Sequence, residues 1–177
     1  MSNPLAPPSA DEYATFYSDY IRRMQDRQIM EVLPHQIDEI AGALGGLSEA
    51  GAMYRPAPTE WSIKEVMGHM NDVERVFSYR LLRVSRNDQT PLPGFEQDDF
   101  VRESGFDQCR LADLIEEFAC LRKATELAIR NTPSGAWLRR GTASGAPVSA
   151  RALAYMLPGH VDHHMQSLRE KYLPGAA

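Results

Sequence analysis

Cysteine is scarce in this sequence. The 177 residues include only two, Cys109 and Cys120, and we expect both on one helix. Their separation of 11 residues, at about 1.5 Å of rise per residue, places them about 16 Å apart, beyond the reach of a disulfide bond. We therefore expect two buried thiols and a fold that needs no disulfide framework.

Long apolar runs and an excess of positive charge are also missing. No stretch approaches the roughly 18 to 20 apolar residues that a membrane span needs. The start of the chain, MSNPLAPPSADEY, lacks the basic and apolar regions of a signal peptide, so we expect a cytoplasmic protein with no membrane partner. The 19 lysine and arginine residues are scattered among 24 acidic ones, with a net charge of -5, so no basic stripe is available to bind a nucleic acid.

Several catalytic motifs are absent as well. The sequence has no G-x-S-x-G motif of a nucleophilic serine, and neither cysteine has a recognisable histidine context. The glycines of GALGGLSEAG follow an expected helix rather than a strand, which indicates a helix end and a loop rather than a phosphate-binding turn. The histidines are then the residues best suited to carry chemistry.

What the sequence does have is helical periodicity. Apolar residues recur at helical spacing in four segments, residues 28–44, 63–84, 111–132 and 149–172, and no strand pattern is clear. Connections of about ten to eighteen residues separate these segments, which predicts an all-α fold, a four-helix bundle with long crossover loops. The stretch NDQTPLPGFEQDDF predicts a long ordered loop, and we expect a small hairpin near residues 137–147.

The composition suits a single globular domain. Apolar residues make up 43% of the chain and charged residues 24%, which are ordinary values for such a domain. Residues 1–9 are rich in proline, serine and alanine and are expected to form a flexible terminus, whereas residues 10–177 form one helical domain. Within it, the segment DEYATFYSDYIRRM carries four aromatic residues and is expected to form a short N-terminal helix.

Three of the five histidines lie in GHVDHH, near the end of the last expected helix. His160 and His164 are four residues apart on one helical face, which is the spacing of a chelating pair, whereas His163 points about 100° away from His164. His69 borders the buried stripe of the 63–84 helix and would face the bundle interior. Three imidazoles can bind one zinc, nickel, iron or copper ion and leave positions open for substrate. The alternative is a structural His69 beside a surface pair, and the residues alone leave both interpretations open.

Nearby carboxylates are candidates for supporting such a site. Glu65, Asp72 and Asp162 lie close enough by helical spacing to fix the imidazole tautomers through their second ring nitrogens. The alternative for each is an ordinary solvated charge. Asp72 and Glu74 are also candidates for a general base.

Two further side chains are candidates for contacting a polar substrate. Tyr155 and Arg80 could both face the same cavity. Alternatively, the Arg80 side chain could extend from the bundle into water. The roles of His35 and His163 stay open.

The segments WSIKEVMGHMNDVERVFSYRLLR and GHVDHHMQSLREKYL together resemble the DinB and YfiT superfamily of damage-inducible, metal-dependent helical proteins, over about residues 28 to 173. The resemblance implies a four-helix bundle in which a histidine follows a Trp-Ser helix start, here Trp61 and Ser62, and a later histidine pair completes a metal site. Those ligand positions are His69, His160 and His164. The expected cofactor is one divalent metal ion, zinc or nickel. Pro158 in MLPGH departs from the pattern and should bend the last helix just before the ligands.

The resemblance also implies a type of reaction. Members of the family include S-transferases that use low-molecular-weight thiols such as bacillithiol or mycothiol, and a related mycothiol-dependent isomerase. We therefore expect a metal-dependent enzyme that binds such a thiol as a thiolate and prepares it to attack an electrophile. The alternatives are a metal-dependent hydrolase using metal-bound hydroxide and a non-catalytic metal-binding dimer. The expected partners are a small-molecule substrate and a second copy of the chain in a homodimer.

Overall fold

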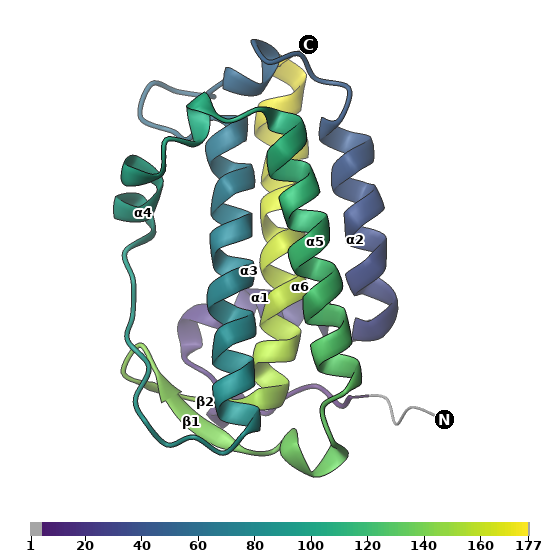
Figure 1. The fold of residues 1–177 in the computed structure, drawn as a ribbon, viewed down its shortest axis with the longest axis vertical. Coiled ribbons are helices and arrows are strands. Elements are labelled where there is room, and N and C mark those ends of the chain that lie inside the picture. The colour runs from purple at the N-terminus through teal and green to yellow at the C-terminus, as the bar shows by residue number, and fades with distance from the viewer. Residues whose placement is uncertain (1–4, 177) are drawn as a thin grey trace.

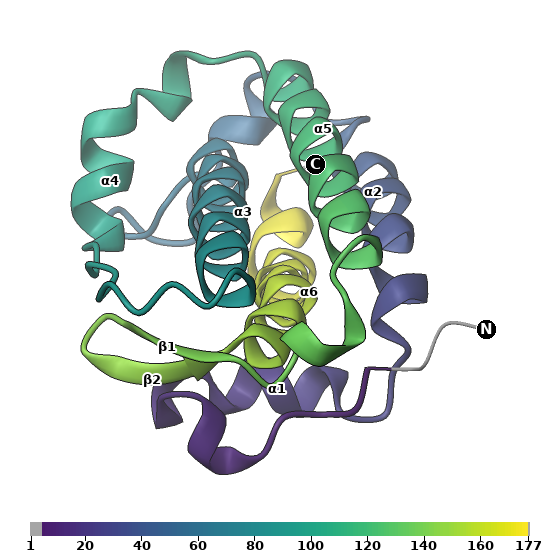
Figure 2. The same cartoon turned by 60° about the horizontal axis from the view of Figure 1, so that its bottom comes forward.

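The computed structural model describes residues 5–176 and is built around four long helices. These are α2 (Ile29–Leu44), α3 (Ile63–Ser85), α5 (Leu111–Arg130) and α6 (Ala150–Ser167). Helices α2 and α6 run in one direction and α3 and α5 in the other (Figure 1). Each packs against two others, in the order α2, α5, α3, α6 around the bundle, which Figure 2 shows from a more end-on direction. The expected all-α four-helix bundle is confirmed.

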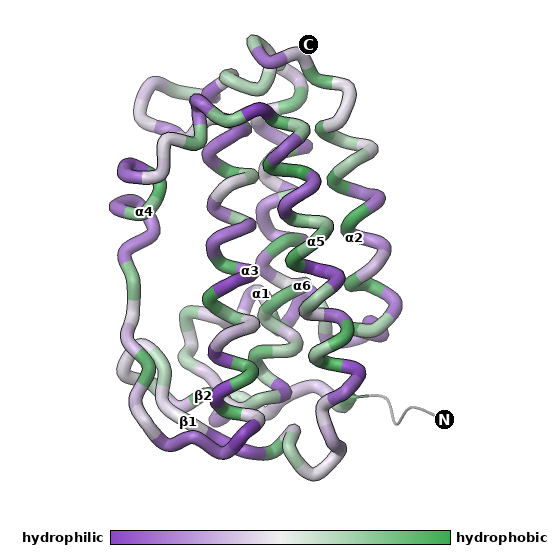
Figure 3. Tube along the Cα trace, in the orientation of Figure 1, coloured by the Kyte–Doolittle hydropathy of each residue, from purple (hydrophilic) through white to green (hydrophobic). Residues whose placement is uncertain are grey.

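The interior of the bundle consists of two apolar clusters that meet at a polar layer. On α3, Val66 and Met70 belong to one cluster and Val73 and Phe77 to the other. Hydrophobic and hydrophilic residues alternate along the trace of each helix, as the two faces of an amphipathic helix require (Figure 3). Where the clusters meet, the buried side chains are polar and come from all four helices: Gln36, His69, Glu74, Arg122 and His160. No helix within residues 5–176 is long and apolar enough to cross a membrane.

Helix α3 begins at a capping box. The Ser62 hydroxyl accepts a hydrogen bond from the Glu65 backbone N–H at 3.0 Å, and the Glu65 carboxylate accepts one from the Ser62 N–H at 2.9 Å. Such a cap stabilises a helix by about 1 kcal/mol. It fixes the first turns of the helix that carries His69.

The connection between α3 and α5 runs along the bundle beside α3 (Figure 1) and differs from the expectation in one respect. The expected loop NDQTPLPGFEQDDF ends in a helix, because its last residues form the start of α4 (Gln97–Ser104). Asp98 and Asp99 lie in the first turn, where carboxylates favour a helix N-terminus. Gly105, with a φ of 69°, ends the helix in the left-handed conformation that glycine adopts readily.

The small hairpin expected near residues 137–147 is present. Strands β1 (Arg140–Ala143) and β2 (Ala146–Ser149) pair in an antiparallel register that joins Ala143 to Ala146 at the turn. Leu92, from the long connection, forms a bridge to Ala143. The hairpin therefore anchors the start of that connection.

The prediction of two buried thiols on one helix is wrong. Cys109 precedes α5 and is partly exposed, and Cys120 lies on α5 but is exposed. The inward face of α5 is set by Phe118 and Arg122, and a residue midway between them points outward. Both cysteines are free, as expected.

The N-terminal part of the chain packs against α6. The expected short helix is α1 (Ser18–Met24), which lies across α6. Residues 1–4 of the expected flexible terminus lie outside the described residues. Leu5 packs against the core, and its carbonyl accepts a hydrogen bond from the Tyr155 hydroxyl.

Candidate metal centre

Three histidines from two neighbouring helices converge in the polar layer. The Nε2 atom of His69 on α3 lies 3.1 Å from the Nε2 atom of His160 on α6. The His164 ring lies 4.9 Å from the His69 ring and 4.5 Å from the His160 ring, between centroids. One nitrogen of each ring lies within 4.8 Å of the other two. Two nitrogens bound to one ion at about 2.0 to 2.1 Å are about 2.9 to 3.4 Å apart, so the His69–His160 spacing suits a shared ion.

Burial keeps these histidines neutral. His69 and His160 are only 2% and 3% exposed, and His164 is half-buried. Removal from water lowers the pKa of His69 to about 4 and, with neighbouring imidazoles adding repulsion, lowers the pKa of His160 and His164 well below the ordinary value. At neutral pH each ring therefore keeps a nitrogen lone pair for a metal ion.

Aromatic rings surround the cluster. The Trp61 ring lies 4.8 Å from the His69 ring, and the Tyr20 ring on α1 lies 5.4 Å from the His160 ring. Phe77, about two turns after His69 on α3, lies 6.1 Å from His160 between ring centroids. These contacts restrict the imidazole orientations and lower the local polarity, which strengthens electrostatic interactions inside the site.

Comparison with known proteins agrees with this geometry. The model of the DinB superfamily matches residues 33–168, which include all three histidines. The chain belongs to the DinB superfamily. Among solved structures, it resembles one described as YfiT from Bacillus subtilis, a probable metal-dependent hydrolase with an unusual four-helix bundle topology. The TM-score is 0.76 at 11% sequence identity, over 93% of this chain and 91% of that one. No match was found among curated proteins.

Pro158, which was expected to bend the last helix, lies inside α6 and does not end it. Helix α6 continues through Pro158 to Ser167, so both His160 and His164 lie on one uninterrupted helix. The Pro158 carbonyl accepts an additional hydrogen bond from the Gln36 side chain at 2.9 Å. The four-residue spacing of His160 and His164 on one helical face, predicted from the sequence, is therefore preserved.

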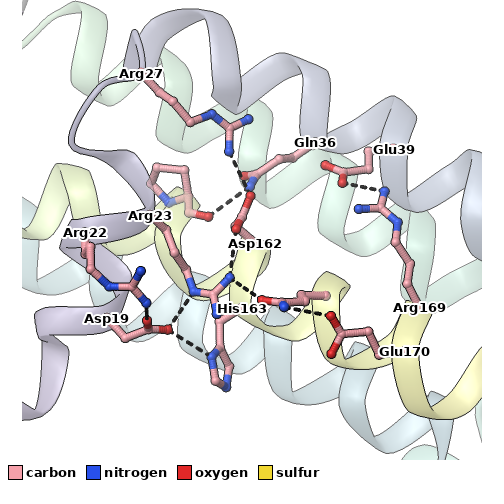
Figure 4. Close-up of polar contacts among 12 residues, drawn as sticks. Asp19, Arg22, Arg23, Arg27, Gln36, Glu39, Asp162, His163, Arg169 and Glu170 are labelled. Atoms are coloured by element: carbon pink, nitrogen blue, oxygen red, sulfur yellow. Dashed lines mark hydrogen bonds and ion pairs between the residues drawn. The ribbon is translucent and has the colours of Figure 1, made fainter.

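The carboxylates expected to fix the imidazole tautomers make other contacts in the described structure. Glu65 belongs to the capping box and pairs with Arg55. Asp162 binds Arg23 and Arg27 at the surface of α6 (Figure 4). Asp72 is half-buried, and burial raises its pKa. It lines a hollow beside α4 rather than bonding to a ligand ring.

Glu74, a candidate for the general base, is engaged elsewhere. Its two carboxylate oxygens accept hydrogen bonds from the Arg122 guanidinium at 3.0 and 2.8 Å, and both residues are buried. The sequence could not reveal this pair, because Arg122 lies on another helix, 48 residues away. Among the described residues, no carboxylate hydrogen-bonds to His69, His160 or His164.

Arg80 and Tyr155, the two candidates for substrate contact, form hydrogen bonds to other parts of the fold. Arg80 is buried and donates to the Pro93 carbonyl at 2.8 Å and to the Ser144 hydroxyl at 3.0 Å. It therefore joins the long connection to the hairpin instead of extending into water. Tyr155 lies in the apolar core with its hydroxyl on the Leu5 carbonyl.

Sequence reasoning missed the contribution of α1. Its Tyr20 ring lies 5.5 Å from the His163 ring, and the His163 Nδ1 atom lies 3.4 Å from the Asp19 carboxylate (Figure 4). Four aromatic residues in this segment were its only sequence signal. His35 is exposed on α2 and takes no part in the histidine cluster.

Proposed function

We propose that this chain is a metal-dependent enzyme that holds one divalent ion, zinc or nickel, at His69, His160 and His164. We further propose that it activates a low-molecular-weight thiol for transfer to an electrophile. The observation that carries the proposal is the convergence of three neutral imidazoles, two buried and one half-buried, to which no carboxylate of residues 5–176 is hydrogen-bonded. Such a ligand set supplies nitrogen donors to a borderline metal and leaves part of its coordination shell for a substrate.

The lack of a carboxylate hydrogen-bonded to the three histidines, among the residues that the structure describes, favours a thiol over water as the nucleophile. A free thiol has a pKa of about 8.5, so holding it as a thiolate at neutral pH requires stabilisation of only about 2 kcal/mol. Water, with a pKa of about 15.7, requires about 12 kcal/mol. A bound ion supplies this stabilisation by lowering the nucleophile's pKa. With Glu74 held by Arg122, a site that relies on the ion alone suits the more acidic nucleophile better.

The proposed transfer is a nucleophilic substitution at carbon by the sulfur of the thiol. The thiol loses its proton to solvent, and its sulfur forms a bond to an electrophilic carbon. The bond from that carbon to its leaving group breaks, and the leaving group departs with the electron pair. His69, His160 and His164 would hold the ion as neutral ligands, and the Trp61 and Tyr20 rings beside them would exclude part of the surrounding water.

Hydrolysis by activated water at the same ligands is the second candidate. The overall likeness to the structure described as a probable metal-dependent hydrolase supports it. Asp72, one turn after His69 on α3, also supports it. Burial raises the pKa of the Asp72 carboxyl, and a raised pKa suits a general base.

The test begins with protein purified without chelator or affinity tag. We expect about one equivalent of metal in the wild type, and its loss in His69→Ala and His164→Ala. The matched control is His35→Ala, because His35 is an exposed histidine outside the cluster. Metal-free wild type that also fails to bind added zinc or nickel would contradict the proposal.

The metal-loaded protein is then assayed with small thiols and an aryl halide, and separately with activated esters. Thiol-dependent loss of the halide that disappears in His164→Ala supports S-transfer. Ester hydrolysis without a thiol, reduced by Asp72→Asn, supports the hydrolase instead. Metal binding with neither activity favours the non-catalytic alternative.

A further inference from the structure

A chain of buried hydrogen bonds crosses the bundle in the same polar layer as the histidines. Glu74 on α3 accepts two hydrogen bonds from Arg122 on α5. Arg122 also donates to the Gln36 side-chain oxygen on α2 at 2.6 Å. The Gln36 amide in turn donates to the Pro158 carbonyl on α6 at 2.9 Å (Figure 4). One residue from each helix of the bundle therefore takes part.

This network is fully buried and internally satisfied. Arg122 and Gln36 are 0% exposed and Glu74 is 2% exposed. The guanidinium also lies 4.9 Å from the centre of the Phe118 ring. Within residues 5–176, no polar side-chain atom of the three is left buried without a partner. Replacing a buried ion pair with well-packed apolar residues is often neutral or stabilising, so stability alone does not account for such a network.

The network ends at the weakest turn of α6. Pro158 has no N–H, so the carbonyl one turn earlier lacks its usual helical partner. Gly159 follows and adds the conformational freedom that makes glycine unfavourable in a helix by roughly 0.5 to 1 kcal/mol. The next residue is the ligand His160. A side-chain bond from Gln36 to the Pro158 carbonyl therefore restrains α6 where its own backbone restrains it least.

Both ends of the network lie on ligand-bearing helices. Glu74 follows His69 on α3, and Pro158 precedes His160 on α6. The bonds through Arg122 and Gln36 consequently connect the two helices by a path that does not pass through the histidines. Arg122 is also close enough to His160 for its charge to contribute to the lowered pKa of that ring.

We propose that Glu74, Arg122 and Gln36 are positioning residues that hold His160 at the correct distance from His69 for a shared metal ion. The inference rests on the metal site of the proposed function and assigns a role to residues that do not touch the ion. The competing explanation is that the network only stabilises the bundle.

Two variants separate these explanations. Gln36→Met removes the bond to Pro158 and leaves the Glu74–Arg122 pair in place. The triple variant Gln36→Met/Glu74→Leu/Arg122→Met removes the network without leaving an unpaired buried charge. The matched control is Glu12→Leu/Arg151→Met, which removes a pair near the start of α6, joined by a 2.7 Å hydrogen bond, in which Glu12 is buried and Arg151 is partly buried.

Zinc affinity is measured by competition with a chromophoric chelator, and ligand geometry by the visible absorption of the cobalt(II) form. We expect zinc affinity to fall about 10- to 100-fold in Gln36→Met and in the triple variant, the range seen when supporting residues of metal sites are removed. The cobalt(II) spectrum should change in both. The control should lose stability but keep the wild-type affinity and spectrum.

Wild-type zinc affinity in a folded triple variant would overturn the positioning role. If the triple variant does not fold, Gln36→Met decides, because its ion pair is intact, and unchanged affinity there overturns the proposal. Failure of the wild type itself to bind zinc or cobalt is a different result, since it overturns the metal site rather than the positioning role.

Discussion

The Nε2 atoms of His69 and His160 lie 3.1 Å apart although 91 residues separate them in the chain. Two buried nitrogens at this distance either share a proton or share a metal ion. A shared proton satisfies only this pair, whereas an ion also engages His164, whose ring lies within 5 Å of both, at 4.9 and 4.5 Å. The position of the third ring therefore supports the proposed metal site over an ordinary hydrogen bond between two histidines.

Metal binding should stabilise the fold. A metal present at one hundred times its dissociation constant adds about 2.7 kcal/mol to the free energy of unfolding, if the unfolded chain does not bind it. We expect zinc or nickel to raise the melting temperature of chelator-treated protein, and His160→Ala to abolish the increase. His163→Ala should retain it, because His163 lies outside the three-nitrogen cluster. An equal increase in His160→Ala would indicate binding elsewhere.

The metal-free protein should lose stability as the pH falls below about 6.5. In the folded state the pKa of His69 is about 4, against an ordinary 6.5, and the pKa values of His160 and His164 are also lowered. At pH values between the folded-state pKa of a histidine and its ordinary pKa, the unfolded chain binds protons that the folded chain does not. The free energy of unfolding therefore decreases as the pH is lowered, by up to about 1.4 kcal/mol per pH unit for each histidine, and it levels off above the ordinary histidine pKa.

Urea unfolding with chelator, at about pH 7.5 and about pH 5.5, measures this dependence. His69→Ala should show a shallower dependence, whereas His35→Ala should match the wild type because His35 is exposed. A pH-independent wild type over this range would show that the histidines are accessible to protons in the folded state.

The helices and the histidine pair of α6 could be predicted because their signals are local. The apolar period of α3 and the four-residue spacing of His160 and His164 depend only on neighbouring residues. Linking His69 to that pair required the family resemblance, since no local rule says which helices become neighbours. The start of α4 was missed because the prolines and glycine before it dominated the interpretation of the segment.

The polar layer could not be predicted from local patterns. Glu74 looked like a free carboxylate because its partner Arg122 comes from a helix that neighbours α3 only in the folded bundle. Arg122 is the largest of the fully buried side chains, a position that composition and periodicity assign to apolar residues. Its environment depends on tertiary contacts with α2 and α3.

Removing one member of the buried ion pair should be costly. Arg122→Leu leaves the Glu74 carboxylate buried without its partner, and we expect a loss of about 3 to 5 kcal/mol in the free energy of unfolding. The double variant Glu74→Leu/Arg122→Leu should recover most of that loss, as measured by urea unfolding. The matched control is Arg75→Ala, whose pair with Glu117 is exposed and should contribute no more than about 1 kcal/mol. A loss in Arg122→Leu as small as in the control would mean that Glu74 becomes protonated or hydrated without difficulty.

Gly159 sets how closely α1 approaches α6 beside His160. A Cβ atom at this position would lie 2.2 Å from the Tyr20 carbonyl oxygen and 2.9 Å from the Tyr20 Cα, which are backbone atoms that cannot rotate away. Gly159→Ala must therefore push α1 off α6 and separate the Tyr20 ring from His160. We expect a loss of about 1 to 3 kcal/mol in the free energy of unfolding, and faster proteolysis within α1.

The matched control for Gly159→Ala is Gly42→Ala, because Gly42 also lies within a helix but has no atom within 4 Å of an added Cβ. Alanine there should stabilise the protein by about 0.5 to 1 kcal/mol, since it removes backbone freedom from the unfolded chain and adds no contact. Opposite signs for the two substitutions would show that the effect at Gly159 comes from the packing of α1. A gain in stability at both positions would mean that α1 moves freely over α6, and that Tyr20 does not restrict His160.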